Sequence, residues 1–340
     1  MRILYAIQGT GNGHLSRAMD VIPCLMKHGD VDILVSGIQS DLTIPFSIKY
    51  KLRGLSFIFG KSGGVDLWKT MVRSNVRKLV KEIRELPVEN YDLVINDFEP
   101  VSAWACYIKN LPCIGLSHQS AVLADETPAP DVTDMMGKFI LSNYAPNTAK
   151  YGFHFQPYAK DIYTPVIRRQ VREQILENGE YYTVYLPSYD DKRLIGKLCQ
   201  FKNVKWDVFS KHNRKAFTSK NVSIQPIHND KFVKSMARSA GVLCGAGFET
   251  PAEALYMKKK LLVIPMRNQY EQQLNAAALK SMGVPVIKNL KSRNDMVIAS
   301  WLENNSTVDV NYPDITGEII GRIIRNHVTN PHFLEIKNIS

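Results

Sequence analysis

The stretch from Gly241 to Tyr256 constrains the fold most strongly, because an apolar run ends in glycines and a helix begins at once. Thr250 suits the N-cap of that helix, Pro251 suits its first turn, and Glu253 completes a capping box. A strand, a glycine turn and a helix start direct free backbone N–H groups and the positive end of the helix dipole at one point. We therefore predict an anion site, most naturally for phosphate, at Gly245, Ala246 and Gly247.

A polar cluster follows the next predicted strand, Lys260 to Pro265. It contains Glu271 and Gln272, whose carboxylate and amide groups suit the hydroxyls of a sugar. Each residue also has a plainer interpretation, since Glu253 either caps its helix or binds a ligand, and Glu271 and Gln272 either bind a sugar or begin a solvated helix. The order of the parts, a phosphate turn followed by a polyol-binding cluster, favours a nucleotide-sugar site.

The N-terminal end of the chain has the same pattern. An apolar run from Arg2 to Ile7 is followed by a glycine-rich turn and then by a predicted helix. In a chain of 340 residues, two such units predict an α/β protein of two doubly wound domains. A dinucleotide site is the obvious alternative for the first turn, but His14 stands where the G-x-G-x-x-G fingerprint needs its third glycine.

These motifs together resemble the nucleotide-sugar glycosyltransferases of GT-B fold, in particular the family 28-like (MurG-like) branch. The resemblance rests on the glycine turn, the helix with Glu253-Ala-Leu, the strand ending at Pro265, and the acid/Gln pair followed by Asn275-Ala. More weakly, it extends across roughly the whole chain. It implies two Rossmann-like domains that face a cleft, with residues 1–160 binding the acceptor and residues 161–314 the donor. The segment 315–340 would hold a terminal helix that crosses back to the first domain.

The resemblance also implies a mechanism and a set of donor contacts. The donor would be a UDP-sugar, and the reaction an inverting, metal-independent transfer without a cofactor to a glycan, lipid-linked or cell-envelope acceptor. The first turn departs from the family's Gly-Gly-Thr-Gly-Gly pattern and Glu271 replaces a Gln, so the sugar and the acceptor stay open. The implied donor contacts are Gly245, Ala246, Gly247 and Ser188 at the phosphates, Glu253 at the ribose, Glu271 and Gln272 at the sugar, and the backbone of Ile227 and His228 at the nucleobase.

The first glycine turn supplies the candidate base. In the resemblance, Gly11, Asn12 and Gly13 help to bind the acceptor, and Gly13-His14 matches the ending of the family's turn. The imidazole of His14 can accept a hydroxyl proton at neutral pH, although a histidine that caps the helix is the alternative.

Two later strands end in further candidates. Asp97 and Glu99 follow a buried strand, and His118 follows the next, at the carboxyl edge where open α/β sheets bind ligands. We expect Asp97 to be a partner or a substitute for His14, and Glu99 and His118 to bind the acceptor, unless they are satisfied rim residues.

The charge of the chain bears on its partners. A formal net charge of +11 should draw the protein to polyanions. No helix-turn-helix, zinc finger or RNA-binding motif is present, so nucleic acid is not expected. Basic residues concentrate between residues 49 and 85, and Val65 to Leu86 is predicted as one amphipathic helix. This basic surface is either a solvated face or a site that docks on an anionic membrane.

The expected location is the cytoplasm, with peripheral attachment to the inner face of the membrane as the role of the basic surface. The sequence has no run of about 18 apolar residues and no signal-peptide pattern. Its five cysteines are scattered, as in a protein with reduced thiols. Two alternatives remain open: a nucleotide-sugar 2-epimerase or hydrolase of the same fold, and a non-catalytic nucleotide-binding GT-B protein.

Overall fold

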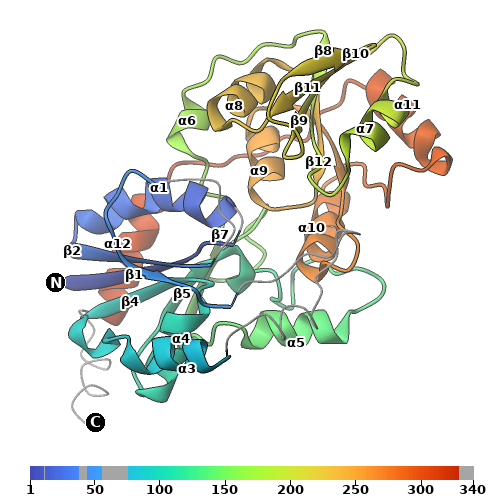
Figure 1. Ribbon diagram of the computed structural model, residues 1–340. Helices are drawn as coiled ribbons and strands as arrows, with labels where there is room; N and C mark the ends of the chain where they lie inside the picture. Colours follow the sequence, from blue (N-terminus) through green and yellow to red (C-terminus); the bar gives the residue numbers. More distant parts are fainter. Residues whose placement is uncertain (11, 38–43, 56–75, 329–340) are drawn as a thin grey trace.

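A computed structural model describes residues 1–10, 12–37, 44–55 and 76–328. Within these residues the strands form two separate sheets, one in each half of the chain, and helices cover both faces of each sheet (Figure 1). The first sheet has the order β3-β2-β1-β4-β5-β6-β7, and the second has the order β10-β11-β9-β8-β12-β13. The prediction of two doubly wound α/β domains is confirmed.

Almost all of the strand pairs are parallel, because helical crossovers join successive strands; among the described strands only β10 runs antiparallel to its neighbour. Strands covered on both faces must be apolar throughout, and every residue of β1 after Arg2 is indeed buried. The strands of the first sheet are β1 (Arg2–Gln8), β2 (Asp30–Ser36), β3 (Ile48–Leu52), β4 (Leu93–Asp97), β5 (Ile114–Ser117), β6 (Ala149–Phe153) and β7 (Ile162–Tyr163). Those of the second are β8 (Tyr181–Tyr185), β9 (Lys205–Ser210), β10 (Phe217–Ser219), β11 (Val222–Pro226), β12 (Gly241–Gly245) and β13 (Lys260–Ile264).

The helices bury an apolar stripe against these sheets. In the first domain they are α1 (Gly13–Met26), α3 (Val76–Glu85), α4 (Pro100–Ile108) and α5 (Met135–Asn143). The short α6 (Arg169–Arg172) follows the link between the domains. The second domain contains α7 (Asp191–Leu198), α8 (Asn229–Arg238), α9 (Glu249–Tyr256), α10 (Tyr270–Ser281) and α11 (Asp295–Glu303), and α12 (Thr316–His327) ends the described chain.

The terminal helix α12 packs beside α1 of the first domain (Figure 1). Its Ile319, Ile320 and Ile323 are buried, and Arg322 forms an ion pair with Asp161 at 2.8 Å. The strand β7 pairs with β6, so the first sheet continues a few residues past the expected boundary at residue 160. The chain thus leaves the first domain after β7 and returns to it through α12.

Because the strands are parallel, the turns that follow them and carry the predicted site residues lie at one edge of each sheet. Ile7 lies opposite Asp97, so the turn after β1 and the end of β4 are neighbours at the carboxyl edge of the first sheet. In the second sheet Gly245 lies opposite Ile264, which places the turn after β12 beside the loop that leads into α10. A large apolar core cluster includes buried side chains of both domains, among them Phe155 and Phe248.

Several predicted elements need correction. The helix predicted from Val65 to Leu86 is described in its second half only, as α3 (Val76–Glu85); residues 56–75 lie outside the described part, so its expected beginning stays a prediction. The helix after the glycine turn begins at Glu249, one residue before the expected N-cap Thr250, and its N-cap position is Phe248 without a side-chain cap bond. No helix was predicted at the position of α5, because the acidic, proline-containing segment before it indicated a loop in this part of the chain.

No helix in the described ranges is both long enough and apolar enough to cross a membrane.

Candidate active site

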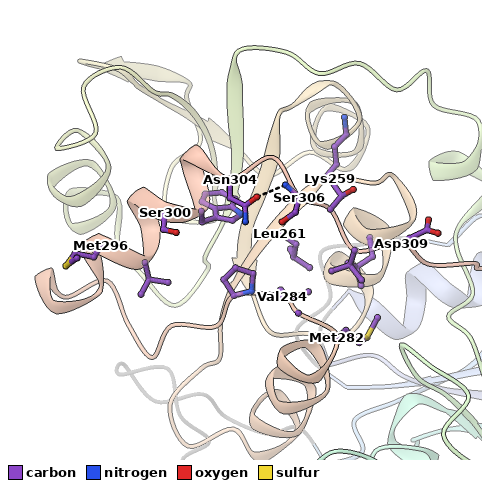
Figure 2. A pocket seen from close by; sticks show the side chains of 16 residues that line it. Lys259, Leu261, Met282, Val284, Met296, Ser300, Asn304, Ser306 and Asp309 are labelled. Atoms are coloured by element: carbon purple, nitrogen blue, oxygen red, sulfur yellow. Dashed lines mark hydrogen bonds between the residues drawn. The ribbon is translucent and has the colours of Figure 1, made fainter.

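A cavity of about 360 Å³ lies between the two domains. The first domain contributes residues after β1, Phe98 and the first half of α5, and the second domain contributes residues 268–271. His14 and Glu271, from opposite domains, both line it. A larger cavity of about 590 Å³ lies within the second domain, between β13, the end of α10 and α11 (Figure 2). None of the predicted site residues lines that second cavity, so the interdomain cavity is the candidate active site.

His14 and Asp97 form the centre of the first-domain side. His14 is the second residue of α1, and its Nδ1 lies 2.8 Å from Oδ1 of Asp97, which is fully buried at the end of β4. Burial would raise the pKa of Asp97, but the charges and hydrogen bonds of Arg17 and His14 outweigh it and hold the pKa below its usual value. An ionised carboxylate only accepts hydrogen bonds, so Nδ1 is the donor and Nε2 carries the lone pair of a base.

The ring of Phe98 forms part of the same wall. Phe98 follows Asp97 directly and has a left-handed backbone conformation with φ of 55°, which a non-glycine residue adopts only under tertiary constraint. Its ring is nearly parallel to the imidazole of His14, with an interplanar angle of 9° and 6.5 Å between centroids. The imidazole of His14 is therefore bordered by an aromatic ring inside the cavity.

Arg17 supports this pair and was missed in the sequence analysis. It follows His14 by one helical turn, and its side chain is 2% exposed. Its Nη2 donates to both oxygens of Asp97 at 2.7 and 2.9 Å, and its Nη1 donates to Glu249 of the second domain. The only signal in the sequence is the i, i+3 spacing from His14, which cannot distinguish a buried arginine from a solvated one.

Glu249 is the second missed residue. It begins α9 directly after the glycine turn, and its side chain is 17% exposed. A Cβ at Gly13 would lie 3.1 Å from Cγ of Glu249, so glycine at position 13 permits this close approach between the domains. Burial raises the pKa of Glu249 to about 7; Arg17 opposes the shift, while Glu253 and Asp97 add to it.

Glu253 does not cap its helix, which corrects the capping-box prediction. Its carboxylate is 2% exposed and binds Arg168 of the interdomain link through two bonds, Nε to Oε1 at 2.5 Å and Nη2 to Oε2 at 2.8 Å. Arg168 also donates to Asn229 at 2.7 Å. The free-energy cost of a buried carboxylate without a charged partner is larger than that of a helix end without a side-chain cap. The tertiary ion pair therefore overrides the local capping preference.

The predicted phosphate turn is open where a ligand would approach. Gly245 ends β12, Ala246 is fully buried, and a Cβ at Gly247 would meet no atom within 4 Å. Gln272 lies beside the turn, and its Oε1 accepts a hydrogen bond from the backbone of Met266 at 2.9 Å.

The other predicted donor residues lie at the same edge of the second sheet. Ser188 is in the turn after β8, and Ile227 and the exposed His228 follow β11, so both turns lie at the carboxyl edge with Gly245. Glu271 accepts a bond from Gln119 of the first domain at 3.0 Å.

Glu99 does not face the cavity. It is fully buried at the N-cap of α4, where its side chain accepts from the backbone of Val101 and Ser102, both at 2.7 Å, and from Ser36 Oγ at 2.6 Å. With its carboxylate engaged in this way, the acceptor-binding role expected for Glu99 has no support. Glu99, which the sequence analysis placed at a strand end as an acceptor-binding residue, caps helix α4 instead.

His118 contacts residues of both domains and does not line the cavity. Its Nε2 lies 2.7 Å from Oδ1 of Asn275 in α10, its Nδ1 lies 2.8 Å from the carbonyl of Phe153, and its ring stacks on Phe248 at 3.9 Å. Burial is the main cause of its lowered pKa. The acceptor-binding role is therefore not supported here either.

The remaining first-turn residues are partly described. Gly11 lies outside the described residues, Asn12 occupies the N-cap position of α1, and Gly13 is the first residue of that helix. In the described part of the chain, no group of three or more His, Cys, Asp or Glu side chains is placed to hold a metal ion.

Comparisons with known proteins agree with this architecture. The sequence profile of the family described as Glycosyl transferase family 1 matches residues 1–305. Curated protein sequences yield no match. Among solved structures, MurG of Acinetobacter baumannii is 15% identical over 95% of this chain and 99% of its own, with a TM-score of 0.55. A co-structure of S. aureus MnaA with UDP is 10% identical over 96% of this chain and 97% of its own, with a TM-score of 0.64.

The glycosyltransferase SnogD from Streptomyces nogalater is 13% identical over 95% of this chain and 99% of its own, with a TM-score of 0.53. At these identities the solved structures show the fold, while the family profile covers most of the chain. The protein therefore belongs to glycosyl transferase family 1 and has the GT-B fold.

Proposed function

We propose that the protein transfers a sugar from a UDP-sugar to an acceptor hydroxyl, with inversion at the anomeric carbon and without a metal ion. The observation that carries the proposal is the His14–Asp97 pair, 2.8 Å apart, at an interdomain cavity that faces the donor domain. A general base must lie on the acceptor side, opposite the leaving diphosphate. His14 meets this condition because it comes from the first domain.

The proposed steps use groups of this chain. Nε2 of His14 takes the acceptor proton while the acceptor oxygen bonds to the anomeric carbon and the bond to the diphosphate breaks. Asp97 remains ionised, fixes the tautomer and stabilises the imidazolium that forms. The N–H groups of the Gly245–Gly247 turn and the dipole of α9 would stabilise the leaving diphosphate.

The donor contacts follow from the resemblance. Glu253 would accept bonds from the ribose hydroxyls with the lone pairs that Arg168 leaves free, since a carboxylate offers about four lone-pair sites. Glu271 and Gln272 would bind the sugar hydroxyls, Ser188 a phosphate, and the backbone of Ile227 and His228 the base.

We infer further that the acceptor carries an apolar or lipid part. The cavity wall on the acceptor side contains Phe98, Met136, Ile140 and Leu141. The exposed face of α5 continues this apolar surface, with Met135 74%, Met136 58% and Phe139 65% exposed. A lipid-linked acceptor at a membrane surface would match it.

Ligand-dependent melting tests the donor. A ligand that binds only the folded state raises the melting temperature, so UDP should protect the protein, while NAD and ATP at equal concentration should not. Equal protection by NAD would contradict the donor assignment. Incubation with UDP-sugars alone is the control for the alternatives, because an epimer or free sugar that forms as fast as any transfer product would indicate an epimerase or a hydrolase.

A further inference from the structure

Helix α9 begins with an acid where the proposed function places a diphosphate. Glu249 is the first residue of the helix and follows the Gly245–Gly247 turn directly. An ionised carboxylate at this place repels a diphosphate, because both are negative and the site is partly shielded from water. Donor binding therefore requires that Glu249 be neutralised or displaced.

Arg17 is placed to take part in that exchange. Its guanidinium holds Asp97 with Nη2 and Nε, and it reaches across the domain boundary to Glu249 with Nη1. Arginine can make both contacts at once because its five N–H groups form a rigid planar fork. The same side chain thus supports the base and binds the first residue of the donor helix.

Glu249 is surrounded by charges from several elements. Arg17 and His14 face it from α1, Asp97 from β4, Glu253 from its own helix and Arg168 from the interdomain link. Since its pKa is raised to about 7, chiefly by burial, a large fraction of the carboxyl group is already neutral near neutral pH. Protonation of Glu249 would release Nη1 of Arg17 for another anion.

We propose that Glu249 is a stand-in anion: it binds Arg17 while the donor site is empty, and the donor diphosphate replaces it as the partner of Arg17. This inference rests on the proposed function, since the diphosphate is that of the UDP-sugar. The ionised fraction of Glu249 takes up a proton from solvent when it is displaced, so donor binding consumes part of a proton at pH 7 and nearly one proton at pH 8 and above. Arg17 then positions Asp97 with one part of its guanidinium and binds the donor diphosphate with the other.

The test compares UDP affinity of the wild type and of Glu249→Gln by calorimetry between pH 6 and pH 8.5. The terminal phosphate of UDP titrates near pH 6, so the informative quantity is the ratio of the two affinities at each pH, in which that titration cancels. If only the neutral form of Glu249 admits UDP, the variant should bind about tenfold more tightly at pH 8 and almost equally at pH 6. Proton uptake on binding should be greater for the wild type than for the variant, by nearly one proton at pH 8, because the titration of UDP contributes equally to both.

Glu180→Gln is the matched control, because it removes the same charge from a side chain that is 88% exposed. It should follow the wild type at every pH. Arg17 itself is a poor test position, since its loss would leave the buried Asp97 without its main partner.

The possible results separate this inference from the proposed function. An affinity ratio that stays near one at all pH values, or weaker binding by Glu249→Gln, would overturn the exchange of anions and leave the donor assignment intact. Failure of both proteins to bind UDP would overturn the proposed function, and the exchange with it. A ratio that rises through pH 7 supports both.

Discussion

At the scale of single residues, the cavity depends on a chain of charged contacts from His14 through Asp97 and Arg17 to Glu249. Each link is short, and all but the ends are buried. A buried network of this kind is stable only when every charge has a partner, so its members cannot be exchanged independently. The orientation of His14 is therefore set by residues of both domains.

Replacement of His14 by Ala should lower turnover by about 10²–10⁴-fold, the usual contribution of a general base. UDP affinity should hardly change, because the histidine lines the first-domain side of the cavity and the proposed UDP contacts come from the second domain. Steady-state kinetics and calorimetry on the same preparation measure the two effects. Wild-type turnover in His14→Ala would exclude it as the base, and the fully buried Asp97 could not readily replace it.

At the scale of elements, helix α9 forms ion pairs with two arginines that lie outside the second sheet and its helices. Glu249 binds Arg17 of α1, and Glu253, one turn later, binds Arg168 of the interdomain link. The helix thus connects the Gly245–Gly247 turn to both the first domain and the interdomain link.

Glu253→Gln should lower the free energy of unfolding by roughly 3 kcal/mol, because it leaves the buried Arg168 without a counter-charge. Arg168→Gln should cost a similar amount, and the double variant should be more stable than the sum of the two losses predicts. Urea unfolding of the four proteins gives the coupling. Additive losses would show that the pair contributes nothing beyond its separate packing.

Gly247→Ala tests the turn before α9. The added methyl group has no neighbour within 4 Å, so stability should change little. UDP affinity should fall at least about tenfold, since the glycine lets the backbone approach the phosphates closely. Gly13→Ala is the contrasting variant: its Cβ would lie 3.1 Å from Glu249, and it should weaken the contact between domains instead. Unchanged UDP affinity in a folded Gly247→Ala protein would move the phosphate site elsewhere.

At the scale of the whole molecule, α3, α4 and α5 lie on the side of the first sheet away from α1 and α12 (Figure 1). Basic side chains of α3 and exposed apolar side chains of α5 therefore belong to the same side of the first domain. This combination of charge and apolar surface suits a docking site on an anionic membrane.

The protein should bind vesicles that contain anionic lipid, and binding should weaken with added salt because exposed charges are screened. Arg77→Glu with Lys81→Glu should reduce it several-fold, and Phe139→Ser should reduce it independently of salt. Lys202→Glu with Lys205→Glu, both exposed on the second domain, is the charge-matched control. Equal binding to neutral and anionic vesicles would argue against an electrostatic docking surface.

Local sequence determined the two strand–turn–helix units and hence the class of fold. The apolar runs before Gly9 and Gly245 can only be buried strands, and the glycines after them only turns, so two doubly wound domains and the place of His14 followed from the chain itself. The roles of the acids did not follow. Glu99, Glu249 and Glu253 each stand at or near a helix start, yet one caps its helix and two bind arginines more than 80 residues away in sequence. Only the packing of the two domains decides which role each acid has. A buried charge is stabilised by whichever opposite charge the fold brings within hydrogen-bond distance, and the spacing of residues along the sequence does not identify that partner.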